Sequence, residues 1–135
     1  MNDAPTVTNP NPSNGRTKVD IDLASWSCTI SDPDGDPFDW SIEISNGDSN
    51  SANGASDGTK SCTITSQLTY HIKYYIWVNV TDGTDFANYT FSFTTEYDPE
   101  TVESLPMHDM TWTLWALLLV IIMIGLVYKW GREIL

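Results

Sequence analysis

The chain has 135 residues and a formal net charge of −12, from 18 acidic and 6 basic residues. Seventeen of the acidic residues precede an uncharged run near the C-terminus, residues 111–128, so the first 110 residues are strongly acidic. A segment of this length allows one domain and not two. Its charge excludes nucleic acid and anionic lipid headgroups as partners of that surface.

The N-terminus lacks the pattern of a secretory signal. Residues 1–5 contain neither a basic region nor an apolar stretch. A domain that lies outside the cell needs an export signal, so we expect this chain to be the membrane-proximal end of a longer surface protein.

The first third of the chain predicts extended structure. Residues 4–16 contain three prolines, which predicts an extended segment or an edge strand. Over residues 18–30 apolar side chains alternate with polar ones, with a phase shift at 24–25 that predicts two strand segments and a bulge. The turn sequence DPDGDP at 32–37 follows, and the alternation at 38–45 predicts another half-buried strand.

The rest of the acidic segment continues this pattern after one polar interruption. Residues 45–60 contain no large apolar side chain, which predicts a solvated loop or a weak edge. The strongest strand pattern is at 74–80, and a turn at 82–85 leads to a closing strand that ends at Thr95. About seven short strands without an amphipathic helix predict an all-β, antiparallel β-sandwich.

Particular residues then resemble a known family. The Leu68 to Tyr74 spacing and the closing FSFTT at 91–95 resemble the C-terminal half of a fibronectin type III or related Ig-like domain. The resemblance implies that Tyr74, six positions after Leu68, forms the tyrosine corner of that family. The segments at 32–47 and 74–95 also resemble repeats of large archaeal cell-surface proteins. The resemblance covers residues 4–95 and implies an Ig-like sandwich outside the cell.

Cys28 and Cys62 are the only cysteines, and both fall on the inward phase of their strands. Thiols oxidise outside the cell, so we predict a disulfide between them, which the resemblance would place between neighbouring strands of one sheet. The alternative is two buried thiols that pack as small hydrophobic groups. A metal site is not expected here, because only the distant His71 and His108 could add ligands.

Aspartates gather in two turns. Asp32, Asp34 and Asp36 alternate within one turn, and an Ig-like sandwich would place this turn at the same end as Asp82 and Asp85. Carboxylate oxygens are the ligands that Ca²⁺ prefers, so these five residues are a candidate calcium site. The alternative is ordinary Asp-Pro and Asp-Gly turn chemistry.

Two further features lie on or beside the strongest strand. Glycosylation sequons begin at Asn79 and Asn88. Tyr75 and Trp77 share the outward phase of the strand, which predicts an exposed aromatic contact patch for an extracellular protein or a carbohydrate. The alternative for this pair is cross-strand packing.

The C-terminal region reads as a membrane anchor. Residues 96–110 are acidic and contain two prolines, which predicts an extended stalk. The run at 111–128 would cover about 27 Å as a helix, which predicts a single-pass transmembrane helix across the bilayer. Lys129 and Arg132 lie in the short tail at 129–135, so we expect the tail in the cytoplasm and the domain at 1–95 outside.

The functional prediction follows from these parts. Neither histidine has a nucleophile or an orienting acid at a recognisable spacing, so no catalytic residue and no enzymatic activity are predicted. We expect a membrane-anchored cell-surface module for binding, adhesion or display, with no cofactor other than Ca²⁺. Two alternatives are a self-assembling subunit of a surface layer or filament, and an accessory subunit that binds a partner in a membrane complex.

Overall fold

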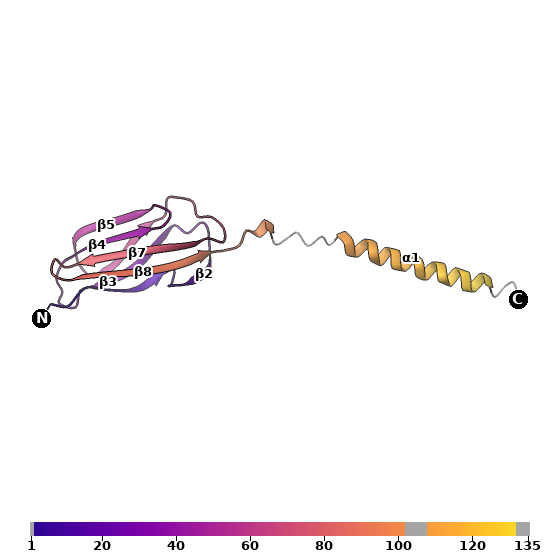
Figure 1. Cartoon of the computed structure of the whole chain (residues 1–135), viewed down its shortest axis with the longest axis horizontal. Helices are drawn as coiled ribbons and strands as arrows, with labels where there is room; N and C mark the ends of the chain where they lie inside the picture. The colour runs from indigo at the N-terminus through magenta and orange to yellow at the C-terminus, as the bar shows by residue number, and fades with distance from the viewer. Residues whose placement is uncertain (1, 102–107, 132–135) are drawn as a thin grey trace. The chain divides into compact units, whose positions relative to one another are not determined.

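The computed structural model describes residues 2–101 and 108–131. The chain divides after Asp98 into two units, and each is described by itself. The first unit contains eight β-strands (Figure 1). They are β1 (Thr6–Asn11), β2 (Arg16–Val19), β3 (Ser25–Ser31), β4 (Phe38–Ile44), β5 (Ser49–Ala55), β6 (Gly58–Thr63), β7 (Lys73–Thr81) and β8 (Phe86–Thr95).

The strands form two sheets that face each other. One sheet has the order β1-β3-β6, and the other has the order β2-β8-β7-β4-β5. Neighbours pair antiparallel except β2, which runs parallel to β8. This is an Ig-like β-sandwich, so the predicted all-β fold class is confirmed for this unit.

The core lies between the sheets and follows from the alternation in the sequence. In β4, the side chains of Phe38, Trp40, Ile42 and Ile44 are all buried, whereas those between them are exposed or half-buried. The same alternation holds in β7. The other buried apolar side chains of the core are Val7, Val19, Trp26, Cys28, Ile30, Cys62, Leu68, Tyr74, Ile76, Val78, Val80 and Phe93.

Two strand predictions need correction. The alternation at 18–23 continues beyond β2 but the strand does not, because the N–H of Asp22 donates to Asp20 Oδ1 at 2.8 Å and closes a turn. The polar segment 45–60 is not a solvated loop. It supplies the exposed edge strand β5, in agreement with the alternative of a weak edge, and also the start of β6, which pairs with β3.

The tyrosine corner is present. The backbone N–H of Thr69 donates to the hydroxyl oxygen of Tyr74 at 2.9 Å, across the connection between β6 and β7. Thr95 holds the same connection from β8, since its hydroxyl donates to the carbonyl of Thr69 at 2.6 Å and accepts from the N–H of Ile72 at 2.9 Å. The role that the resemblance implied for Tyr74 is therefore confirmed.

The predicted disulfide is not formed. Cys28 and Cys62 are buried free thiols on β3 and β6, as the alternative supposed. The strand register explains this, because Cys28 lies opposite Lys60 and Cys62 lies opposite Trp26. The two cysteines are therefore diagonal neighbours across the strand pair and not direct partners. The Cα atoms of diagonal neighbours are about 7–8 Å apart, which is farther than the usual Cα separation in a disulfide.

Both thiols should be nearly inert in the folded protein. Burial raises the pKa of Cys28 to about 11, and it also raises the pKa of Cys62. At pH 8 only about one Cys28 thiol in a thousand would be ionised, and the thiolate is the reactive form. We expect a thiol reagent to label native protein at least about a hundredfold more slowly than protein in guanidinium, where two thiols should react. Fewer than two reactive thiols in denaturant without a reductant would contradict the free state.

The second unit contains a short 3₁₀ helix, η1 (Pro99–Thr101), and a long helix, α1 (His108–Gly131). Part of the predicted stalk, residues 102–107, and the tail residues 132–135 lie outside the described residues. Helix α1 begins before the end of that predicted stalk. Within residues 2–101 and 108–131, no helix is both long and apolar enough to cross a membrane, so the predicted transmembrane helix is not supported there.

Candidate functional site

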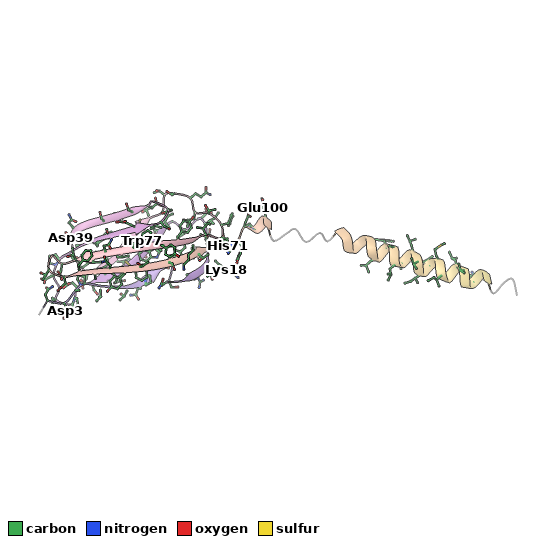
Figure 2. The ribbon with its side chains drawn as sticks, viewed as in Figure 1. Asp3, Lys18, Asp39, His71, Trp77 and Glu100 are labelled. Atoms are coloured by element: carbon green, nitrogen blue, oxygen red, sulfur yellow. The ribbon has the colours of Figure 1, made fainter. Side chains whose placement is uncertain are left out.

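An aromatic strip lies on the outer face of the five-stranded sheet. The side chains of Tyr75 and Trp77, on β7, are 43% and 41% exposed. Their rings stack with centroids 6.5 Å apart and planes 20° from parallel, and the ammonium of Lys73 lies 5.2 Å from the Tyr75 ring centroid. Figure 2 places Trp77 over the middle of the sandwich. The two side chains are therefore exposed as predicted, as a pair of nearly parallel rings, and their role as a contact patch stays a prediction.

A groove runs beside this strip. It consists of two hollows of about 270 Å³ and 250 Å³, which share Ser41 and Ser51 in their linings. Trp77 lines the first hollow, and Phe86, which is 62% exposed, lines the second. The other polar residues that line the groove are Asp39, Glu43, Asp48, Ser49, Asn50, Asn53, Asn79 and Thr81.

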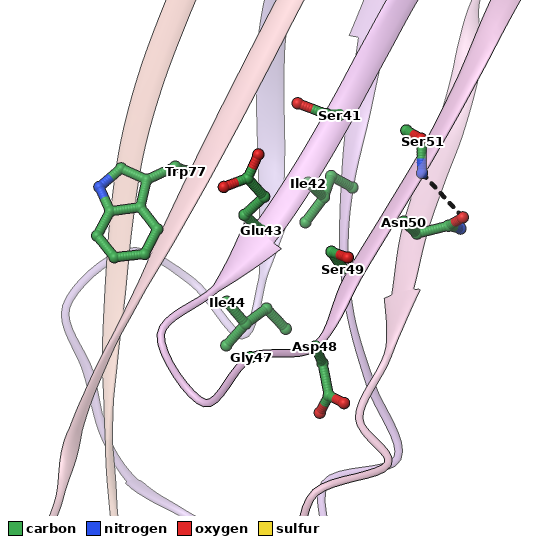
Figure 3. Close-up of a pocket in the computed structure, with 10 residues that line it drawn as sticks. All are labelled: Ser41, Ile42, Glu43, Ile44, Gly47, Asp48, Ser49, Asn50, Ser51 and Trp77. Carbon is green, nitrogen blue, oxygen red and sulfur yellow. Dashed lines mark hydrogen bonds between the residues drawn. The ribbon is translucent and has the colours of Figure 1, made fainter.

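Neighbouring strands place these groups together. Glu43 on β4 is the cross-strand partner of Trp77 on β7 and of Ser49 on β5, so a carboxylate, an indole and a hydroxyl lie side by side. Figure 3 shows side chains of these three strands around the first hollow. No lysine or arginine lines either hollow. The groove thus offers hydroxyl, amide and carboxylate partners next to an exposed aromatic face.

The two aspartate turns do lie at one end of the sandwich. The side-chain amide of Asn2 donates to Asp82 Oδ2 at 2.8 Å and to Asp85 Oδ2 at 3.0 Å. The next residue, Asp3, donates its N–H to Asp34 Oδ2 at 2.7 Å. The extreme N-terminus therefore connects the turn before β4 to the turn before β8.

Inside these turns the carboxylates mainly accept backbone hydrogen bonds. Asp32 Oδ1 accepts from the N–H groups of Asp34 and Asp36, and the N–H groups of Thr84 and Asp85 lower the pKa of Asp82. No group of three or more histidine, cysteine or acidic side chains among the described residues could hold a metal ion.

One atom at this end has no partner. Asp32 is 5% exposed, and its Oδ2 is buried without a hydrogen bond to any residue that the structure describes. Calcium binding at this end stays a prediction, which a comparison of the unfolding temperature in calcium and in EDTA would test.

Asp48 is the centre of a hydrogen-bond network that the sequence did not predict. We call the carboxylate of Asp48 and its donors the Asp48 network. Asp48 follows β4 in a tight turn where Gly47 adopts a φ of 98°, a conformation that favours glycine. Its carboxylate accepts from the hydroxyl and N–H of Thr65, at 2.5 and 3.0 Å, and also from Ser66 and Asn46. These bonds, with that of the Thr65 hydroxyl foremost, lower the pKa of Asp48 to about 2. The Asn-Gly-Asp turn at 46–48 was the only sequence signal for it.

Sequence reasoning found the aromatic strip but not the groove beside it. Alternation identifies which side chains of β4 and β7 point outward, so Tyr75 and Trp77 were predictable. The side of the groove formed by Ser49 and Ser51 was not predictable, because it depends on the pairing of the polar strand β5 with β4.

Comparisons with known proteins include a match to a solved structure. No protein-family model matches the chain, and no curated protein matches it. Among solved structures, it is similar to the PKD domain of an M14-like peptidase from Thermoplasmatales archaeon SCGC AB-540-F20. The sequence identity is 20% over 71% of this chain and 99% of that chain, and the TM-score is 0.46. The Ig-like fold assigned above rests on the strand order itself.

Proposed function

We propose that this chain is a non-catalytic binding module of the cell surface that holds a carbohydrate on the outer face of its five-stranded sheet. The observation that carries the proposal is the groove between β5 and β7 with the stacked Tyr75 and Trp77 at its side. Flat aromatic faces cover the apolar C–H faces of sugar rings, and the groove hydroxyls and carboxylates can pair with sugar hydroxyls. The Lys73 ammonium lies beside the groove, 5.2 Å from the Tyr75 ring centroid, but no basic side chain that the structure describes lines the groove itself. Such a lining disfavours an acidic polymer and suits a neutral or amino sugar.

Membrane attachment is a second part of the proposal. The sequence supports it through the uncharged run at 111–128. The large apolar side chains described between Leu114 and Val127 on α1 are each 48% exposed or more. Such an extent of apolar surface is unfavourable in water and is stabilised by lipid. Retention of the native chain in membrane pellets at alkaline pH would support attachment, and release into the supernatant would contradict it.

The binding proposal makes a specific prediction about Trp77. Replacement of Trp77 by alanine should weaken carbohydrate binding at least about tenfold, since a few large aromatic side chains commonly carry most of the energy of a contact. The full chain in mild detergent would be tested by pull-down on chitin, cellulose and starch and on an array of surface glycans. Tyr97→Ala, which removes an exposed aromatic side chain outside this face, is the matched control and should bind as the native chain does.

Two results would contradict the proposal. One is the absence of binding to every carbohydrate tested, and the other is equal retention of the Trp77→Ala and native proteins. Circular dichroism of both variants would establish that they are folded.

A further inference from the structure

The two glycosylation sequons meet on the outer face of the sheet. Asn79 on β7 and Asn88 on β8 are direct cross-strand partners, so their side chains leave the sheet on the same side. Directly opposed residues have Cα atoms about 5 Å apart, so a glycan on one of them would crowd a glycan on the other. The structure therefore presents a choice between the two sites.

The sequon at Asn79 is engaged in the fold. The side-chain amide nitrogen of Asn79 donates to Ser41 Oγ at 3.2 Å. The hydroxyl of Thr81, which completes this sequon, donates to the carbonyl of Asp85 at 2.7 Å and accepts from the N–H of Gly83 at 3.1 Å. Both groups that glycosylation requires are thus held by other contacts.

In the sequon at Asn88, the two side chains that glycosylation requires are exposed and not engaged in hydrogen bonds within the described part of the chain. Asn88 and Thr90 are exposed, and neither side chain forms a hydrogen bond with any residue that the structure describes. Their backbone is also more accessible. β7 lies between β4 and β8, whereas β2 pairs with β8 only at Phe93 and Thr95, so residues 86–91 of β8 form an edge of the sheet. A transferase can pull an edge segment away from the sheet with fewer broken hydrogen bonds than a central strand.

We propose that Asn88 is the N-glycosylation site of this chain and that Asn79 is left unmodified. The donor is an oligosaccharide on a lipid diphosphate carrier. The amide nitrogen of Asn88 bonds to the anomeric carbon of the sugar, the bond from that carbon to the carrier oxygen breaks, the lipid diphosphate leaves and the amide loses one proton. No oxidant or reductant is involved.

The position of this glycan has two consequences. It covers the exposed edge of β8, where unpaired backbone groups would otherwise pair with another strand. It also stands beside the hollow lined by Asn79 and Phe86, so it narrows access to the groove. This second consequence rests on the proposed function, whereas the modification itself does not.

Mass spectrometry of the full chain, purified from its own host, tests the assignment. Intact mass should show one glycan, and peptide mapping of the native protein, which needs no variant, should place it on Asn88. The extra mass should vanish in Asn88→Gln and Thr90→Ala and persist in Asn79→Gln, the matched control. An unmodified chain, a glycan on Asn79, or glycans on both residues would overturn the proposal.

Binding measurements separate this inference from the proposed function. Asn88→Gln should bind carbohydrate as tightly as the glycosylated chain or more tightly, and Trp77→Ala in that background should still lose binding. Carbohydrate binding by an unmodified native chain would overturn only the glycosylation site. A glycan on Asn88 without any carbohydrate binding would overturn only the proposed function.

Discussion

Replacement of Asp48 by asparagine is expected to lower the free energy of unfolding by about 3 kcal/mol, because several donors would lose a charged acceptor at once. The Asp48 carboxylate accepts from Thr65, Ser66 and Asn46, and it joins the turn between β4 and β5 to the connection between β6 and β7. Asparagine offers one acceptor oxygen, and its NH₂ group would face donors. Thermal unfolding should show a midpoint lower by more than about 10 °C.

Asp36→Asn is the matched control for this change. Asp36 is an exposed turn residue whose carboxylate accepts no hydrogen bond from the residues that the structure describes. Its replacement should alter the free energy of unfolding by less than about 0.5 kcal/mol. Equal effects of the two replacements would show that the Asp48 network contributes nothing specific to the free energy of unfolding.

The same carboxylate makes stability depend on pH. The pKa of Asp48 is lowered from 3.8 to about 2 in the folded chain, so the unfolded chain binds its proton first as the pH falls. The stabilisation is therefore fully present above about pH 5 and is lost progressively as the pH falls towards 2. Urea unfolding at several pH values should show that the free energy of unfolding falls less steeply with decreasing pH for Asp48→Asn than for the native chain. Parallel curves of this free energy against pH would contradict the prediction.

Replacement of Thr95 by valine should destabilise the sandwich by about 2 kcal/mol. Thr95 is 1% exposed, and its hydroxyl donates to the carbonyl of Thr69 and accepts from the N–H of Ile72. Valine has nearly the same shape, so the change would leave these backbone groups without their partner while the packing is retained. Thr94→Val, at the neighbouring half-buried position, should alter stability by less than about 0.5 kcal/mol.

Chemical denaturation of both threonine variants would measure this difference. The slope with denaturant should be unchanged, since the same surface is exposed on unfolding. If Thr95→Val lowers the free energy of unfolding no more than Thr94→Val does, water replaces the lost hydroxyl as the hydrogen-bond partner.

Much of the sandwich could be predicted where local pattern and tertiary contact agree. The alternation of Phe38, Trp40 and Ile42 indicates a strand with one buried face whatever its neighbours are. The resemblance to fibronectin type III domains, carried by Leu68 and Tyr74, implied the corner that the Thr69 hydrogen bond completes. Prediction was weakest at 49–63, where β5 and the start of β6 carry few apolar side chains and owe their structure to pairing with β4 and β3.

By itself, the sequence determined the class of the fold, the faces of its longest strands, the exposed position of Tyr75 and Trp77, and the uncharged run at 111–128. These depend on side-chain periodicity and composition, which are local properties. Only the tertiary structure decided which strands are neighbours and in what register. That register keeps Cys28 and Cys62 apart, sets Asn79 opposite Asn88, and brings together the residues of the Asp48 network and of the groove. Each of these depends on how strands and turns meet in space, which side-chain periodicity within one strand does not fix.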